Sequence, residues 1–222
     1  MGMVASVNVA TPQPTPWKKN VRFTGIGKHP VTGPVAVRAP GPRRGGLGSG
    51  LLGDFIGDTK HHGGDDQAVY AFQREDLDLW QHQLGRELPD GMFGENLTTR
   101  DIDVNAARVG ERWRVGSVEL QVTSPRTPCA TFRGWLGEPG WARMFSLEAR
   151  PGAYLRVLVP GEVQAGDSIE VIERPEHDVS ISLYFRAITR ERELLPDLLP
   201  AAEFLGAETL ELIERRETMV LD

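Results

Sequence analysis

Hydrophobic and polar residues alternate with a period of two in several short segments of the chain. Such alternation predicts half-buried β-strands, because successive side chains of a strand point to opposite faces of a sheet. The pattern is clearest where Val118, Leu120 and Val122 share one face. The segments expected to be strands are 4–9, 22–26, 35–37, 68–72, 97–99, 112–115, 118–122, 152–159 and 168–173. Many short strands with closely spaced turns favour a compact β-barrel or sandwich with few helices.

A helical period of about 3.6 residues appears in fewer places. Leu77, Trp80 and Leu84 lie on one helical stripe, and Gly85 follows as a helix-ending residue. A second short helix is expected over 141–148.

After Pro175 the pattern becomes helical, over 179–190, 193–204 and 207–216. Pro196 and Pro200 predict that the middle helix is short or kinked. A helical piece of this size is marginal alone, so we expect it to dock on the barrel or on another subunit. The fold class is therefore mainly β (α+β). Its predicted parts are a barrel domain over 1–174 and a C-terminal helical extension over 175–222.

The single cysteine of the chain, Cys129, follows the clearest hairpin. Gly116 and Ser117 suit the tight turn of that hairpin, and Pro125 and Pro128 prevent its second strand from continuing in the middle of a sheet. Two arginines flank the cysteine, at 126 and 133. If their guanidinium groups lie near the sulfur, they favour the thiolate, which attacks electrophiles and binds metals. Without such neighbours, a lone cysteine is usually a small buried hydrophobic residue.

Composition limits the classes of function. The 222 residues carry a net charge of -6 and are 40% hydrophobic, which is ordinary for a globular protein. General nucleic-acid binding is not expected of an acidic chain, because phosphate contacts need clustered Lys and Arg. One cysteine excludes an internal disulfide and suits the reducing cytoplasm, where we expect the protein. The sequence has no apolar run of about 18 residues and no signal-peptide pattern, so we expect no membrane insertion.

Two glycine-rich stretches are candidate ligand-binding loops. Residues 48–53 match the dinucleotide fingerprint GxGxxG by letter, but Pro40 and Pro42 precede them and no helical pattern follows. A flexible surface loop over 41–57 is therefore the interpretation. Gly63 and Gly64 permit positive φ and are expected to leave backbone N–H groups open to a ligand. The scattered His residues and one Cys do not form a zinc site of the usual spacing.

Four segments occurring in order resemble the MOSC domain family, which includes the C-terminal part of molybdenum cofactor sulfurases. They are 28–35, 62–69, 91–97 and 125–129, and the helical tail resembles the three-helix extension of the bacterial branch linked to hydroxylaminopurine resistance. The chain has Asp65 where the family pattern usually has Pro. The resemblance implies a MOSC-type β-barrel with a few peripheral helices and a molybdenum cofactor (molybdopterin) whose metal is bound by Cys129.

The resemblance further implies a molybdenum-dependent oxidoreductase that reduces N-hydroxylated small molecules, including N-hydroxylated bases. The sequence has no flavin or iron–sulfur motif, so the electrons are expected from a separate reductase, and a homodimer is left open. Cys129 and His62 are the candidate catalytic residues. His62 could protonate the leaving oxygen, because imidazole changes charge near neutral pH, or it could be a structural histidine. The candidate cofactor-binding residues are Lys28, Lys60, His62, Asn96, Arg126 and Thr127.

Two other functions remain open from the sequence. Cys129 could carry a persulfide in a sulfur-transfer protein, or the chain could be a non-catalytic module that binds an anion or a cofactor in the same pocket. Stoichiometric molybdenum would separate the first interpretation from sulfur transfer, which requires cyanide-labile sulfur instead.

Overall fold

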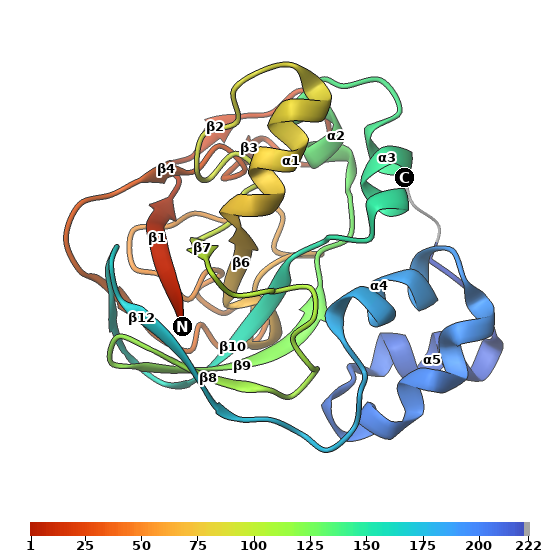
Figure 1. Cartoon of the computed structure of the whole chain (residues 1–222). Helices are drawn as coiled ribbons and strands as arrows, with labels where there is room; N and C mark the ends of the chain where they lie inside the picture. Colours follow the sequence, from red (N-terminus) through yellow and green to blue (C-terminus); the bar gives the residue numbers. More distant parts are fainter. Residues whose placement is uncertain (220–222) are drawn as a thin grey trace.

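The computed structural model describes residues 1–219 and is built around a closed β-barrel (Figure 1). The strands of the barrel are β1 (Gly2–Val9), β6 (Val69–Gln73), β7 (Leu97–Arg100), β8 (Arg112–Val115), β9 (Val118–Pro125), β10 (Ala153–Val159) and β12 (Ser168–Glu173). Their order is β12-β8-β9-β10-β6-β7-β1, and β12 also pairs with β1, which closes the barrel. The β6–β7 pair is parallel, so the barrel is mixed. The predicted MOSC-type barrel fold is confirmed.

Smaller elements decorate the barrel. The short strands are β2 (Gln13–Pro14), β3 (Phe23–Thr24), β4 (His29–Pro30), β5 (Val35–Val37) and β11 (Gly161–Val163). The helices are α1 (Arg74–Leu84), α2 (Ala130–Leu136), α3 (Trp141–Glu148), α4 (Ile181–Thr189) and α5 (Ala207–Arg215), with 3₁₀ segments η1 (Asp65–Gln67) and η2 (Arg192–Phe204). In Figure 1, α1, α2 and α3 lie at one end of the barrel and the C-terminal helices lie along its side.

The hairpin β8–β9 forms as the alternation predicts. Val115 pairs with Val118 across the turn, and Gly116 there has a φ of +56°. Val118, Leu120 and Val122 are at most 1% exposed, so this face of β9 points into the barrel. At its far end Pro125 still pairs with Ala153 of β10. The chain then leaves the sheet, which places residues 126–129 at the end of a supported strand.

A cluster of aromatic side chains fixes α2, the helix that starts directly after Cys129. The Phe132 ring lies 5.2 Å from Phe93 and 5.4 Å from both Trp141 and Phe145, and all four residues are fully buried. Edge-to-face ring contacts of this kind contribute about 0.5–1.5 kcal/mol each beyond area burial. The position of the cysteine therefore depends on this cluster as well as on β9.

The C-terminal helices pack on the barrel. Tyr184, Leu195 and Leu198 belong to the same hydrophobic cluster as the barrel interior, and Phe185 of α4 contacts Phe145 of α3 at 5.9 Å. The prolines at 196 and 200 lie in η2, which is a 3₁₀ segment instead of an α-helix, consistent with the missing N–H of proline. The division into domains 1–174 and 175–222 stays a prediction, and residues 220–222 lie outside the described residues.

The structure contains one helix that the sequence did not predict, and one sequence-based expectation was wrong. Residues 130–136 form a helix that the sequence did not predict, because Thr131 and Gly134 weaken the helical pattern. Residues 48–51 of the supposed flexible loop are buried, Gly50 donates a backbone hydrogen bond to Ala68, and Leu51 pairs with Val37. No helix follows residues 48–53 directly, so the segment lacks the strand–loop–helix context of a dinucleotide fingerprint.

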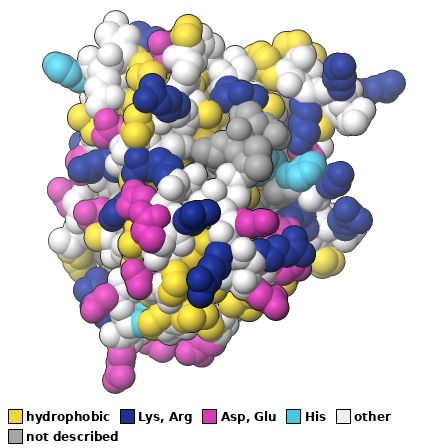
Figure 2. Space-filling model, turned by 90° about the vertical axis from the view of Figure 1, so that its right-hand side faces the viewer, with side chains coloured by type: hydrophobic (Ala, Val, Ile, Leu, Met, Phe, Trp, Pro, Cys, Tyr) yellow, Lys and Arg dark blue, Asp and Glu magenta, His cyan; other side chains and the backbone are white. Residues whose placement is uncertain are grey.

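The face that carries the C-terminal helices mixes Lys and Arg with Asp and Glu side chains (Figure 2). Such a mixed surface differs from the clustered basic surface that nucleic-acid phosphates require. Among residues 1–219, no helix is both long and apolar enough to cross a lipid bilayer.

Two glycines allow a close backbone contact at the edge of the candidate site. A Cβ on Gly25 would lie 1.8 Å from the Phe55 carbonyl oxygen, and one on Gly57 would lie 1.8 Å from the Phe23 carbonyl oxygen. We expect Gly57→Ala to destabilise the fold by about 1–3 kcal/mol, because a backbone segment must move. Thermal unfolding should show this as a fall in Tm of roughly 2–4 °C per kcal/mol.

Gly206→Ala is the matched control for this substitution. Gly206 has a φ of -70°, and a Cβ there would meet no atom within 4 Å. Its cost should stay below about 1 kcal/mol, which is the scale of a changed helix N-cap. Equal losses in the two variants would contradict the close-contact explanation.

Candidate functional site

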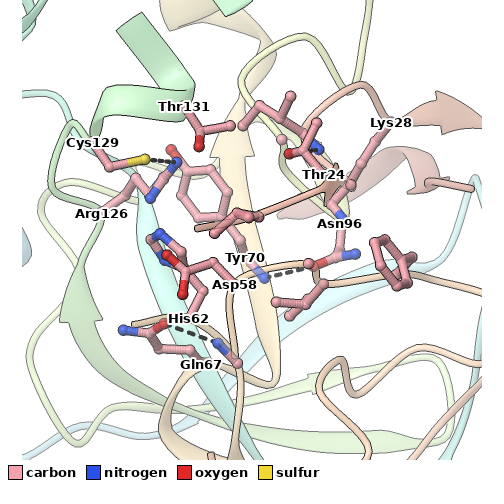
Figure 3. Close-up of a pocket in the computed structure, with 18 of the residues that line it drawn as sticks. Thr24, Lys28, Asp58, His62, Gln67, Tyr70, Asn96, Arg126, Cys129 and Thr131 are labelled. Carbon is pink, nitrogen blue, oxygen red and sulfur yellow. Dashed lines mark hydrogen bonds between the residues drawn. The ribbon is translucent and has the colours of Figure 1, made fainter. Parts of the chain in front are cut away.

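A pocket of about 90 Å³ lies where the segment after β9 meets the 54–67 segment and β3 (Figure 3). Five of the residues singled out in the sequence line it, namely Lys28, His62, Asn96, Arg126 and Cys129. They come from four separate stretches of the chain. The barrel therefore assembles these side chains around one cavity.

Cys129 faces this pocket beside a buried guanidinium group. Nη2 of Arg126 lies 3.7 Å from the cysteine Sγ. Burial alone would raise the pKa of the Cys129 thiol, but Arg126 and His62 lower that pKa to about 5. At neutral pH the residue is therefore a thiolate, the form that acts as a nucleophile and as a metal ligand.

Arg126 is 5% exposed and makes no ion pair with a carboxylate among residues 1–219. Its guanidinium lies 5.3 Å from the centre of the Phe132 ring. Burial alone would lower the pKa of Arg126, but Tyr154, Cys129 and Tyr70 raise it above the ordinary value. A buried cation is costly unless it is paired. The pocket is thus suited to an anionic group beside the thiolate.

Lys28 and Asn96 line the same pocket but already have protein partners. Lys28 Nζ lies 2.5 Å from Asp54 Oδ1, and the Asn96 amide nitrogen donates to Asp54 Oδ2 at 2.9 Å. Asn96 also donates to the Asn8 carbonyl at 3.3 Å and accepts from the Tyr70 N–H at 3.1 Å. Burial lowers the pKa of Lys28, while Asp54 opposes that shift. These contacts make Lys28 and Asn96 part of a buried hydrogen-bond network in the wall of the Cys129 pocket. Their contact with a cofactor stays a prediction.

The segment containing His62 has the predicted positive φ at Gly63 and Gly64, both +81°. The expectation that their N–H groups are open to a ligand was wrong. Gly63 donates to the Gln67 side chain at 3.2 Å, and Gly64 donates to the Gly48 carbonyl at 3.0 Å. A Cβ on Gly64 would lie 2.7 Å from the Arg43 nitrogen, so this glycine is needed for close packing. His62 itself points into the pocket (Figure 3).

Lys60 and Thr127 do not line the Cys129 pocket. They line a wider groove of about 890 Å³ between the barrel and the C-terminal helices. The groove and the pocket share Gly63 and Gln67 in their walls. That Lys60 and Thr127 bind a cofactor stays a prediction. Any such contact would lie in this groove.

Two tyrosines that the sequence pattern did not single out lie in the pocket wall. Tyr70 of β6 pairs with Tyr154 of β10, and their rings lie 5.2 Å apart. Burial raises the pKa of both phenols, so both remain neutral. Each tyrosine sits in a predicted strand, but the pairing of these strands could not be read from the alternation.

Two other polar residues near the pocket have local structural roles. Glu95 accepts hydrogen bonds from the N–H groups of Gly91 at 2.6 Å and Phe93 at 3.0 Å, so it ties down its own turn. Asp58 lies 2.5 Å from Lys18 Nζ, which holds the loop between β2 and β3 at the pocket edge. Burial alone would raise the pKa of Asp58, but Lys18 and His61 lower it.

The fold and the pocket define a closed-barrel protein with a half-buried cysteine beside a buried arginine. The MOSC domain model matches residues 58–170, just over half of the chain, and the chain belongs to the MOSC domain family.

Three similar proteins cover different shares of the sequence. The uncharacterized protein YflK of Bacillus subtilis is 29% identical over 178 residues, which cover 80% of this chain and 76% of YflK. A protein named "Reductase" from Gibberella moniliformis is 30% identical over 156 residues, which cover 68% of this chain but 27% of that protein. The crystal structure of YiiM from Geobacillus stearothermophilus matches with a TM-score of 0.77 at 26% identity, over 97% of this chain and 99% of that one.

The thiolate can be tested by alkylation. The rate of iodoacetamide labelling should be half-maximal near pH 5, since the pKa of Cys129 is about 5, whereas a free thiol titrates near about 8.5. Arg126→Met should move the midpoint upward by about one pH unit or more, because the favourable charge is lost. Arg126→Lys keeps the charge and should move it less. A wild-type midpoint above pH 8 would rule out the proposed ion pair.

The buried Lys28–Asp54 pair makes a separate stability prediction. Asp54→Asn leaves the Lys28 ammonium, which is 7% exposed, without its counter-charge. We expect a loss of about 3–5 kcal/mol in the free energy of unfolding, measured by urea denaturation. Adding Lys28→Met to this variant should recover a large part of the loss. A loss below about 1 kcal/mol in Asp54→Asn would show that the Lys28–Asp54 pair contributes little to the stability of the fold.

Proposed function

We propose that this protein binds a molybdenum cofactor through Cys129 and reduces N-hydroxylated small molecules. The observation that carries the proposal is the pair formed by the Cys129 thiolate and the buried Arg126, which face one pocket. Among residues 1–219, no carboxylate forms an ion pair with this arginine. A thiolate is a soft ligand, and a soft ligand suits a metal that changes oxidation state. Membership of the MOSC domain family supports the choice of metal cofactor.

The chemistry of the residues fits such a group. Cys129 would hold the metal, and Arg126 would face an anionic part of the cofactor or substrate. A pocket of about 90 Å³ is small for a whole pterin cofactor. Lys60 and Thr127 in the adjoining groove of about 890 Å³ would then hold the parts that extend beyond it. The bound cofactor would supply the electron transfer, while the protein orients the reactants and sets the charge around them.

The proposed reaction consumes two electrons and two protons. The N–O bond of the hydroxylamine breaks, the oxygen leaves as water, and the nitrogen becomes an amine. His62 lines the pocket with Cys129 and is the residue proposed to deliver a proton to the leaving oxygen. Tyr70 and Tyr154, which stay neutral, would form an aromatic wall against the substrate.

The electrons would come from a separate reductase. The Gibberella protein named "Reductase" matches this chain over 27% of its own length, so most of that protein lies outside the shared region. We propose a separate chain as the electron donor, because this sequence contains no flavin or iron–sulfur motif. A reducing compartment such as the cytoplasm would keep the thiolate available.

Sulfur transfer is the second candidate, because a thiolate with a pKa of about 5 is also a suitable persulfide carrier. A non-catalytic binding module is the third, since the Arg126 pocket would hold an anion without any reaction. Both alternative functions are compatible with the same pocket geometry. They differ from the molybdenum-dependent reductase in the group that Cys129 holds.

Metal and pterin analysis tests the proposal directly. Protein made in a cofactor-competent host should contain about one molybdenum and one pterin per chain and should reduce N-hydroxylated bases with an artificial donor. Cys129→Ser should lose molybdenum and activity together, because the hydroxyl is a poor soft ligand. Arg192→Gln, in η2 of the extension, is the control and should keep both.

The alternatives give different results in the same preparation. Cyanide-labile sulfur without molybdenum would favour sulfur transfer. Bound pterin without turnover would favour the binding module, and full molybdenum content in Cys129→Ser would refute the ligand assignment.

A further inference from the structure

A second groove lies on the outer side of α2 and is not used by the proposed reaction. Its volume is about 560 Å³, and its lining includes Trp17, Ala130, Arg133, Glu138 and Arg143. Ala130 directly follows Cys129, so the groove and the Cys129 pocket meet at the start of the same short helix. In Figure 1, α2 and α3 lie beside each other at this end of the barrel.

The groove has the composition of a protein-binding surface. Arg133 and Arg143 are exposed, and neither forms an ion pair among residues 1–219. Within the described part of the chain, Glu138 is the one carboxylate in the lining. Trp and Arg are the residue types that most often carry binding energy in interfaces. The positive groove stands out on a chain whose net charge is -6.

Trp17 connects this groove with the wall of the Cys129 pocket. Its ring lies directly on Gly134, where a Cβ would come within 2.1 Å of Trp17 Cγ. The centre of the Trp17 ring is 6.3 Å from that of Trp135. The Trp135 ring in turn contacts Gly27, where a Cβ would lie 2.8 Å from the ring, and Gly27 lies between two residues that line the pocket. A redox group seated in the groove would therefore lie close to the pocket.

We propose that this groove is the docking surface for an acidic, flavin-bearing electron-transfer protein. The inference rests on the proposed function, because the proposed reduction needs a donor of two electrons and a reduced flavin supplies both. The reduced flavin of the partner supplies two electrons and is oxidised, and the N-hydroxylated substrate is reduced to amine and water with two protons. Arg133 and Arg143 attract the acidic face of the partner, and Trp17 provides an apolar contact between them.

The test uses the cofactor-loaded protein and reduced flavodoxin, an acidic FMN protein, as the probe. Arg133→Glu and Arg143→Glu should each lower the second-order rate of electron transfer about tenfold at low salt, because charges at the edge of an interface act mainly on association. The double variant should lose more, and its rate should depend less on salt. Arg192→Glu, which lies in η2 and does not line the groove, should match the wild type.

Two further measurements separate docking from catalysis. With reduced riboflavin, a small neutral donor, all variants should turn over within about twofold of the wild type, since no charged surface is recognised. Calorimetry with the cofactor-free protein should show weaker flavodoxin binding in Arg133→Glu and Arg143→Glu, independently of any turnover.

The possible failures are distinguishable. If riboflavin supports turnover but flavodoxin does not, or if the charge reversals leave the flavodoxin rate and its salt dependence unchanged, the docking proposal is overturned while the proposed function stands. If the loaded wild-type protein shows no turnover with either donor, the proposed function fails and the docking proposal fails with it.

Discussion

The site depends on one interaction, the contact between the buried Arg126 guanidinium and the Cys129 sulfur. Burial opposes both charges, and each group favours the charged form of the other. Together they form a neutral pair that still leaves most of the N–H donors of Arg126 free of carboxylates. That arrangement is costly for folding alone, and it is the feature that distinguishes a binding pocket from an ordinary packed interior.

The contrast with Lys28 strengthens this interpretation. Lys28 is buried to a similar degree in the same pocket, yet it has a carboxylate partner that is itself held by Ser49 and Asn96. Lys28 is thus paired with a carboxylate, whereas Arg126 contacts the Cys129 sulfur and the Phe132 ring. Two residues that look equivalent in the sequence therefore differ in their surroundings, since Lys28 has a carboxylate partner and Arg126 has none among residues 1–219. Ligand contact stays a prediction for both.

Much of the architecture could be predicted from alternation and turn chemistry. The β8–β9 hairpin and its inward face were readable because Val118, Leu120 and Val122 repeat with period two and Gly116 marks the turn. The grouping of Cys129, Arg126 and His62 was expected from the family motifs.

Helix α2 was missed because it is stabilised by Phe132 among distant aromatic rings, and tertiary contacts of this kind leave no local pattern. The sequence also could not show that Lys60 and Thr127 line a different cavity from Cys129. Pro125 and Thr127 line the groove while Arg126 lines the pocket, so the two faces of one short segment serve different cavities.

The glycine-rich segment shows how the same residues can indicate opposite properties. Gly48 and Gly50 suggested flexibility, but Gly50 lies so close to Ala68 that a Cβ would come within 2.8 Å of its carbonyl oxygen. Gly63 and Gly64 approach the Gly48 carbonyl and the Arg43 backbone in the same way. These glycines are therefore required where two backbone segments touch, and their lack of a side chain permits rigidity here. The consequence reaches the site, because the contact fixes the segment that carries His62 against the barrel and holds the imidazole on the same side as the thiolate.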